Sequence, residues 1–552
     1  MNRSETSTQQ LDHLGIVAGI CQQIDLIGQI DQIVGTNGRK VSVGQAIQAM
    51  VLNGLGFVNR PLYLTPEFYA NKPVEVLIGR GIKAEDLNDD SLGRALDAVY
   101  RVGVTQVFAQ VASHALYVMN IRVRFAHTDT SAFSLEGTYA KPTETVEDEK
   151  TVPIQITYGY SKDHRPDLKQ AMLGLICANT SSLPIWLTAL DGNCSDKKSL
   201  VALAQAYLKQ FKDAEETPYI VADSALYSKE NLKTLSAVKW VTHVPVTLKQ
   251  AQQLLTEIEQ QQMQVGGKDY FYYERTVTYG GIEQRWLLVL SEPKLERDVK
   301  QLNKAVAKER DQANKTLKQL GRENFSCEAD ARLALSRLAE KWTYHRLESQ
   351  VKPHSRHAQV GRPRVGAQPI VVWKARGKPM LDEKRLAALR APLGKYIIAT
   401  NELDAQKLST AELLGVYKDQ NRSVERDFRF LKDPLFFAAS FYLKKTSRIM
   451  SLLMVMGLSL LVYALAEYVV RTQLVQQDQT IPNQVGKATK TPTMRRIFQM
   501  FDGIDLLIIQ NGDIRLTQIL NLRPIHHQLL VLLGPTIQRF YMPITYRQSW
   551  VT

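Results

Sequence analysis

The chain is poor in cysteine, with four residues among 552 (Cys21, Cys177, Cys194 and Cys327) and no Cys-x-x-Cys pair. This spacing excludes a disulfide-stapled scaffold and a cysteine-based structural zinc site, so we expect reduced thiols. The first ten residues also lack the apolar core of a signal peptide. The sequence therefore predicts a cytoplasmic protein.

Long apolar runs are scarce as well. One run of 18 uncharged residues lies between Arg448 and Glu467, which is at the lower limit for a helix that spans a bilayer. Nothing else in the sequence is typical of a membrane protein. We therefore expect a helix buried in a large soluble core, and no membrane partner.

Acidic residues are outnumbered, which gives a net charge of +14 and a pI near 9.3. A surplus of cations suits a polyanionic partner such as nucleic acid. The length of 552 residues exceeds what one hydrophobic core usually organises, so several domains are expected.

Residues 417–432 combine charge and helical periodicity. Four charged residues recur at spacings of 3, 4 and 3, which stacks them along one face of a helix. They are Arg422, Glu425, Arg429 and Lys432. A neighbouring apolar stripe can dock this helix on a core. It comprises Val424, Phe428, Leu431 and Leu435. One carboxylate flanked by cations fits a metal ligand beside phosphate-binding side chains, and it equally fits a solvated face with ion pairs.

Two upstream aspartates favour the metal-ligand interpretation of Glu425 over the solvated helix face. Asp129 lies near the middle of a predicted strand at 124–136, and Asp223 ends a short apolar strand that begins at 218. Carboxylates at strand ends are where an α/β sheet places chemistry. Two aspartates and Glu425 would repel one another without cations between them. Hard oxygen ligands suit Mg²⁺ or Mn²⁺, and two such ions can clamp a phosphodiester.

The order of strand aspartate, strand aspartate and helix glutamate resembles the DDE transposases of bacterial insertion sequences. Tyr417, Arg422, Glu425 and Lys432 resemble the Tyr-Arg-Glu-Lys signature of the group named after insertion sequence 4. The tyrosine lies eight residues before the glutamate instead of seven, the arginine three before it instead of four, and the lysine seven after it, as in the pattern. Segments 160–170 and 191–196 also resemble this family.

The resemblance implies an α/β fold with an RNase H-like catalytic core interrupted by a large inserted domain, a helical N-terminal domain and a helical C-terminal region. The expected domains are 1–120, helical, for DNA-end binding or assembly; 121–245, first part of the core; 246–393, inserted, with a β-hairpin, long helices and a basic linker; 394–470, second part of the core with the glutamate helix; and 471–552, a helical tail.

The resemblance also implies an activity, namely phosphodiester hydrolysis at transposon ends followed by strand transfer into target DNA. Asp129, Asp223 and Glu425 would bind two Mg²⁺ or Mn²⁺ ions. The implied partners are terminal inverted repeats, target DNA and a second copy of the chain in the DNA complex, with the protein on the nucleoid when bound. Two alternatives stay open: a non-catalytic DNA-binding protein derived from a transposase, and a metal-dependent nuclease without strand transfer.

DNA-binding side chains are expected at two places. By the resemblance, the helix at 417–432 would contact end DNA through Tyr417, Arg422, Arg429 and Lys432. The second place is the basic, Pro/Gly-rich stretch 346–378, where Arg362 and Arg364 resemble an arm that enters the minor groove. A solvated linker is the alternative there.

The pattern also predicts individual elements. Helices are expected at 11–34, 43–55, 89–100, 105–117, 197–211, 296–320 and 329–342, with Ser42 as the N-cap of the helix at 43–55. Strands are expected at 123–135, 152–160, 170–178, 219–222, 240–244 and 394–401, with a hairpin at 270–279 and 283–290. In insertion-domain transposases an aromatic residue can stack on a flipped base. For Trp286 and Trp373 we expect burial in a core, and base stacking is the alternative. His127 shares a strand face with Asp129. We expect it to be a hydrogen-bonded structural histidine, and contact with metal-bound water or DNA is the alternative.

Overall fold

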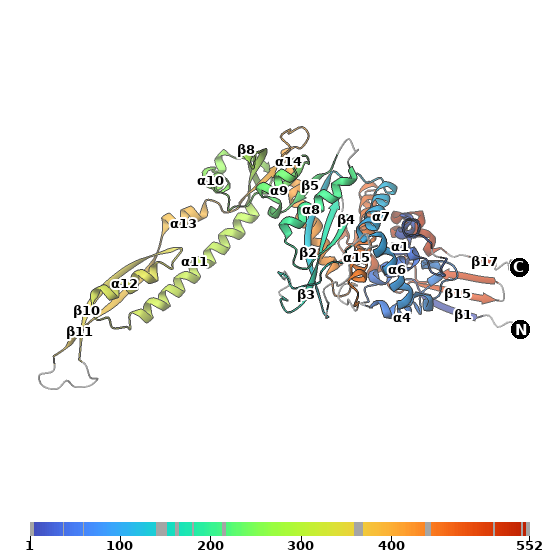
Figure 1. Ribbon diagram of the computed structural model, residues 1–552, viewed down its shortest axis with the longest axis horizontal. Helices are drawn as coiled ribbons and strands as arrows, with labels where there is room; N and C mark the ends of the chain where they lie inside the picture. Colours follow the sequence, from blue (N-terminus) through green and yellow to red (C-terminus); the bar gives the residue numbers. More distant parts are fainter. Residues whose placement is uncertain are drawn as a thin grey trace. The chain divides into compact units, whose positions relative to one another are not determined.

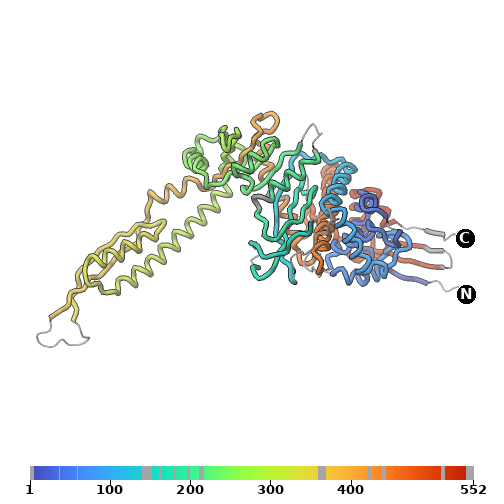
Figure 2. Tube along the Cα trace, viewed as in Figure 1, coloured from blue at the N-terminus to red at the C-terminus, as the bar shows by residue number. Residues whose placement is uncertain are grey.

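The computed structural model describes residues 5–36, 38–58, 60–137, 139, 152–160, 165–178, 182–211, 217–357, 368–436, 443–511, 514–542 and 545–547. The chain forms two compact units (Figures 1 and 2). The first comprises Met1–Thr242, Gly280–Ile282 and Gln406–Thr552, and the second comprises His243–Tyr279 and Glu283–Ala405. All candidate carboxylates belong to the first unit.

The N-terminal part of the first unit is mainly helical. Its longer helices are α1 (Leu14–Gln23), α2 (Leu26–Val34), α3 (Val43–Leu55), α6 (Asp89–Val102) and α7 (Val104–Val118). The predicted cap of α3 is confirmed, because Ser42 Oγ accepts from Gln45 N (3.1 Å) while Gln45 Oε1 accepts from Ser42 N (2.9 Å). Asn88 caps α6, because its Oδ1 accepts from Ser91 N (2.9 Å). Local side-chain chemistry therefore sets where these helices begin.

The apolar run forms part of α15 (Thr446–Gln476). Among the described residues this is the one helix long and apolar enough to cross a membrane, and 94% of its apolar window is buried inside the protein. It packs against α1, α3, α6, α7, α17 (Pro524–Leu533) and β4 (Leu183–Leu190). The protein's own elements thus cover this helix, as expected for the core of the first unit.

The main sheet of the first unit has the order β4-β3-β2-β5-β6, and Figure 1 labels β2, β3, β4 and β5. Its further strands are β2 (Phe125–Leu135), β3 (Lys169–Ala178), β5 (Tyr219–Ala222) and β6 (Trp240–His243). β3 runs antiparallel to β2 and β4, whereas β5 runs parallel to β2 and β6.

The prediction of a strand at 152–160 was wrong. Only an isolated bridge joins Thr157 to Gln170, and the third strand is instead β4. The segment bonds to a nearby turn, since Gln155 N donates to Asp191 Oδ1 (2.7 Å) and Gly192 N donates to Gln155 O (2.9 Å). These bonds replace the ladder that a strand would need.

Two helices cover opposite faces of this sheet. α8 (Asp196–Leu208) packs on β2, β3 and β4, and α14 (Thr410–Leu431) packs on β2, β3 and β5. Gly174 of β3 lies beneath Leu203 of α8, because a Cβ built there would be 3.1 Å from Leu203 Cδ2. Gly174 pairs with Thr130, so α8 covers the face of Thr130. Side chains alternate along a strand, so Asp129 points to the other face, where α14 lies.

The C-terminal region corrects the expectation of a helical tail. It contains α16 (Met494–Met500) and α17, but also a four-stranded antiparallel sheet, β1-β15-β16-β17 (Figure 1). The strands are β1 (Glu5–Gln10), β15 (Asp505–Asn511), β16 (Ile514–Ile519) and β17 (Thr545–Arg547). The N-terminal region thus begins with a strand, whose partner lies at the far end of the sequence.

The second unit contains a sheet with the order β12-β9-β8-β7. Its strands are β7 (Gln264–Gly267), β8 (Tyr270–Tyr279), β9 (Ile282–Ser291) and β12 (Lys395–Thr400). The predicted hairpin is confirmed, and Gly280 and Gly281 have φ of 64° and 83°, as a two-residue hairpin turn requires. Trp286 of β9 is buried and donates to Gln284 Oε1 (3.1 Å). It is a core residue in this structure.

The rest of the second unit includes α10 (Lys249–Glu257), α11 (Glu292–Leu320), α12 (Glu328–Ala339) and α13 (Glu383–Arg390). The prediction of a basic linker within 346–378 was wrong, since the described residues of this stretch pair as two antiparallel strands. They are β10 (His345–Arg356) and β11 (Ile370–Leu381). Polar residues on the outer face and the prolines obscured the strand pattern. Pro353, for example, lies opposite Trp373, which packs on an apolar core.

Candidate active site

Asp129 and Asp223 arise from adjacent parallel strands. β2 and β5 pair with Phe125 opposite Tyr219 and His127 opposite Val221. If this register is continued for two residues beyond His127 and Val221, Asp129 lies level with Asp223. Neighbouring strands are about 4.8 Å apart, so the two carboxylates project from neighbouring points of the sheet. Asp129 is half-buried, and Asp223 is exposed.

Local hydrogen bonds orient both aspartates. Asp129 Oδ1 accepts from Thr130 N (2.7 Å), and Asp223 Oδ1 accepts from Ala225 N (2.9 Å) in the turn after β5. The carbonyl of Asp223 accepts from the hydroxyl of Thr242 (2.7 Å), a fully buried residue of β6. The chain therefore holds Asp223 in place just beyond the end of its strand.

Glu425 comes from α14. Ser409 begins this helix by accepting from Glu412 N (3.3 Å). The expected stripe is buried at Val424, Phe428 and Leu431, which fixes the side of the helix that faces the core. Glu425 is exposed beside that stripe.

The stripe does not extend to Leu435, which is 45% exposed. α14 ends at Leu431, and Pro434 follows soon after. A residue that precedes proline avoids the helical region, so Asp433 cannot continue the helix. Leu435 consequently leaves the helical register on which its predicted burial depended.

Tyr417 connects two of the carboxylates electrostatically. Burial, together with the negative charges of Asp223 and Glu425, raises the pKa of this phenol to about 12. Both carboxylates thus act on the same hydroxyl. The phenol stays protonated at neutral pH and can donate a hydrogen bond.

The predicted cations take different positions. Lys432 caps the C-terminus of α14 and places Nζ 5.6 Å from the ring centroid of Phe133. Phe133 is four residues after Asp129 on β2, so both point to the same face. Arg429 is exposed on α14, and the side chain of Arg422, also on α14, lies outside the described residues. Arg362 and Arg364 lie outside the described residues altogether.

A buried ion cluster lies behind α14, and the sequence reasoning missed it. Glu467 of α15 is 2% exposed. It accepts from Arg426 Nη1 (2.9 Å), Arg471 Nη1 (2.9 Å) and Met494 N (3.0 Å). Arg426 adjoins Glu425 in the sequence, so this cluster ties the glutamate helix to the core helix. A carboxylate closing an 18-residue uncharged run was the only available signal.

Buried polar groups also lie under the site. Burial raises the pKa of Asp427, which contacts the thiol of Cys177 on β3. His127, opposite Cys177 in the register, is fully buried, and burial lowers its pKa to about 4. Within the described part of the chain, neither of its ring nitrogens has a hydrogen-bond partner. His127 is therefore neutral at neutral pH, and the expectation of a hydrogen-bonded structural histidine was wrong as far as the described residues show.

The donor set has the chemistry for a divalent cation, since three carboxylates are the hard oxygen ligands that Mg²⁺ and Mn²⁺ take. The geometry is only partly assembled. In the residues that the structure describes, no group of three or more His, Cys, Asp or Glu side chains is close enough to hold an ion. The structure brings Asp129 level with Asp223 and relates Asp223 and Glu425 through Tyr417.

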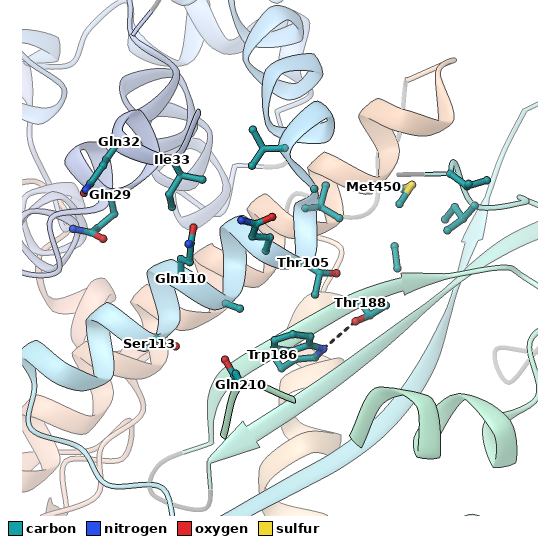
Figure 3. A pocket seen from close by; sticks show the side chains of 18 residues that line it. Gln29, Gln32, Ile33, Thr105, Gln110, Ser113, Trp186, Thr188, Gln210 and Met450 are labelled. Atoms are coloured by element: carbon teal, nitrogen blue, oxygen red, sulfur yellow. Dashed lines mark hydrogen bonds between the residues drawn. The ribbon is translucent and has the colours of Figure 1, made fainter. Parts of the chain in front are cut away.

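A separate cavity of about 1060 Å³ lies where α2 and α7 approach the edge strand β4 (Figure 3). Its polar lining includes Gln29, Gln110 and Trp186, whose Nε1 donates to Thr188 Oγ1 (3.1 Å). None of the three carboxylates lines it. The cavity is therefore distinct from the candidate site on β2, β5 and α14.

The α/β sheet thus places Asp129 and Asp223 at adjacent parallel strands, and α14, which covers one face of the sheet, carries Glu425. The chain belongs to the family described as Transposase DDE domain, whose model matches residues 139–462. That match includes Asp223 and Glu425, while Asp129 precedes it. The chain is thus a member of a transposase family.

Residues 6–113 match a second family model, described as a domain of unknown function (DUF4277). No curated protein matches the chain. Among solved structures, one similar chain comes from a cryo-EM structure of a piggyBac transposase synaptic complex with hairpin DNA. It is 10% identical with a TM-score of 0.36, and the similarity covers 90% of this chain and 82% of that one.

Proposed function

We propose that this protein is a DNA transposase that hydrolyses phosphodiester bonds at transposon ends and transfers the freed ends into target DNA. Membership of the DDE family supports the reaction class. The observation that carries the proposal is the register of β2 and β5, which sets Asp129 level with Asp223. The shared influence of Asp223 and Glu425 on Tyr417 adds the third carboxylate.

The fold supports a more specific assignment. A strand order of β4-β3-β2-β5-β6, antiparallel first and then parallel, with helices on both faces, is what an RNase H-like core would have. About 200 residues separate Asp223 from Glu425, far more than a loop, and most of them belong to the second unit. That supports an inserted domain. Tyr417, Arg422, Glu425 and Lys432 support membership of the group named after insertion sequence 4.

Asp129, Asp223 and Glu425 would hold two Mg²⁺ or Mn²⁺ ions. Bound there, the ions would supply the activated water and the charge stabilisation that in-line displacement at phosphorus requires. Like charges disfavour one another at close range, so three carboxylates that are not closely grouped are compatible with this role.

The surrounding side chains would bind and orient DNA. Lys432 and Arg429 would contact phosphates of the transposon end, together with Arg422. Tyr417, kept neutral by its raised pKa, would donate to a phosphate oxygen. Contacts of this kind position DNA without reading its sequence. The proposed partners are terminal inverted repeats, target DNA and a second copy of the chain, in the cytoplasm on the nucleoid.

The test compares the native chain with Glu425→Gln on DNA carrying the flanking element ends, with Mg²⁺. We expect the variant to fold and bind DNA but to lose cleavage and joining. Glu412→Gln is a matched control on the same helix, because Glu412 pairs with Arg124 (3.0 Å) away from the carboxylates. Cleavage without joining would favour the nuclease, and binding without cleavage by the native chain would favour the non-catalytic protein.

A further inference from the structure

The ribbon of β10 and β11 has one basic face. The two strands pair in register with Lys352 opposite Lys374 and Gln350 opposite Arg376. Even-numbered residues of both strands therefore share a face, because side chains alternate along a strand. All six lysine and arginine residues of the two strands fall on this face: Arg346, Lys352, Arg356, Lys374, Arg376 and Lys378.

The opposite face of the ribbon packs on its own small core. Ala375 joins a buried cluster with Leu317 of α11 and Leu335 of α12, and Leu347 and Val351 pack against that cluster. Figure 1 shows β10 and β11 beside α12 and α11. The ribbon is thus supported along its inner face. On the basic face Val372 is buried, whereas Arg346, Lys352, Arg356 and Arg376 are exposed.

One glutamate anchors the base of the ribbon. Glu309 of α11 accepts from the backbone N–H groups of Thr343 (2.8 Å), Tyr344 (2.8 Å) and His345 (3.1 Å), and it bonds His345 Nδ1 (2.9 Å). These bonds hold the first residues of β10 to α11 and so support the base of the ribbon.

Two of the six cations have structural partners. Lys374 donates to the carbonyls of Arg322 (2.8 Å) and Glu323 (3.0 Å), and Lys378 lies 3.5 Å from Glu348. Glu348 is the only acidic residue on either strand. For the other four, no ion pair occurs among the described residues. All four are exposed: Arg346, Lys352, Arg356 and Arg376.

We propose that this basic face binds the major groove of duplex DNA, outside the carboxylate site. The inference rests on the proposed DNA transposase function and adds a second DNA contact to it. The major groove is about 12 Å wide and admits a two-stranded β-ribbon. A 12-residue strand spans roughly 40 Å at about 3.4 Å per residue, so cations on both strands can reach phosphates along both groove walls.

Duplex RNA fits this surface less well, because the major groove of A-form RNA is deep and narrow. A basic ribbon that is rigid and already extended loses little conformational freedom on binding a regular duplex. The groove geometry therefore favours B-form DNA over duplex RNA as the partner.

The test compares two triple variants of the full chain. The ribbon variant is Arg346→Gln, Lys352→Gln and Arg376→Gln. The control variant removes three exposed lysines of α11: Lys300→Gln, Lys304→Gln and Lys308→Gln. Both lose three positive charges, so a general effect of net charge is matched. Thermal unfolding of each variant checks that both remain folded.

Affinity for a duplex carrying the element end is measured from low to moderate salt. Each phosphate contact contributes about 0.9 to the slope of log affinity against log salt. We expect the ribbon variant to lower the slope by about 2 to 3, and the control to leave it unchanged. Methylation of guanine N7, which lies in the major groove, should interfere with binding of the native chain and not of the ribbon variant.

Equal slopes in the ribbon and control variants would overturn the proposal. So would a ribbon variant that loses affinity for duplex RNA but keeps its affinity for duplex DNA. Failure of the native chain to bind duplex DNA would overturn it together with the proposed function. Mg²⁺-dependent cleavage by the same proteins separates the two. Unchanged slopes with active cleavage would refute the ribbon alone, whereas a reduced slope with equal activity in the native chain and Glu425→Gln would refute the catalytic site alone.

Discussion

Replacing Glu467 with glutamine tests whether the buried cluster behind α14 positions the site. Glu467 is 2% exposed and accepts from Arg426, Arg471 and the backbone of Met494. The substitution keeps the shape of the side chain but removes its charge. Two guanidinium groups then face each other without a carboxylate between them.

The magnitude follows from the burial of the three groups. Breaking a fully buried ion pair costs about 3–5 kcal/mol. The side chains of Arg426 and Arg471 are 39% and 24% exposed, so they regain part of their hydration. We therefore expect Glu467→Gln to lower the free energy of unfolding by about 2–3 kcal/mol, measured by urea denaturation.

The functional effect should be selective. Arg426 adjoins Glu425, so a loosened α14 displaces the proposed metal ligand. We expect kcat for DNA cleavage to fall at least tenfold while the KM for end DNA changes little, since 1.4 kcal/mol corresponds to about a factor of ten. A merely structural role would leave kcat of the folded fraction unchanged.

Glu412→Gln serves as the control for stability too. Its partner Arg124 is 52% exposed and Glu412 is 30% exposed, and such surface pairs contribute about 0–1 kcal/mol. If Glu467→Gln destabilises the protein no more than Glu412→Gln does, the buried cluster does not hold α14, and the reasoning fails.

Three further predictions concern other parts of the chain. Gly457→Ala should lower the free energy of unfolding by about 1–3 kcal/mol in thermal melts, because the added Cβ would lie 2.4 Å from Leu187 Cδ1 and 3.0 Å from Phe108 Cε2; a rise in stability would contradict the tight packing of α15. Burial lowers the pKa of His13 from 6.5 to about 4, so the unfolded chain takes up a proton first and stability should fall by up to about 3 kcal/mol as pH drops from 6.5 to 4. His13→Gln should remove that component in urea titrations at several pH values, whereas the half-buried His114→Gln serves as the comparison. Glu309→Gln should speed hydrogen exchange at the start of β10, because three backbone N–H groups lose a charged acceptor; unchanged exchange there would exclude the anchor.

Elements that depend on local chemistry were predictable from the sequence. Ser42 signalled the start of α3, and Gly280-Gly281 signalled a two-residue hairpin turn. Phe428 and its neighbours at helical spacing predicted the buried side of α14, although Pro434 ended that stripe before Leu435. In each case the signal lay within a few residues of the feature.

Elements that depend on distant partners were not predictable in this way. β1 pairs with β15, so Glu5 lies opposite Gln510, and no local pattern links segments so far apart. Arg426 and Glu467 likewise meet only after α14 and α15 pack together. The sequence could assign Asp129 to a strand and Glu425 to a helix. That Asp129 lies level with Asp223 follows only from the register in which β2 and β5 pair.

The same distinction explains how the candidate site must be held together. Chain connectivity cannot position Glu425 against Asp223, because about 200 residues intervene and most of them fold in another unit. Its position depends instead on the faces of α14: Phe428 and Leu431 pack inward, and Arg426 is tied to Glu467. The residues that set the geometry of the carboxylates therefore lie on the inner side of α14, where a sequence search for catalytic residues would not look.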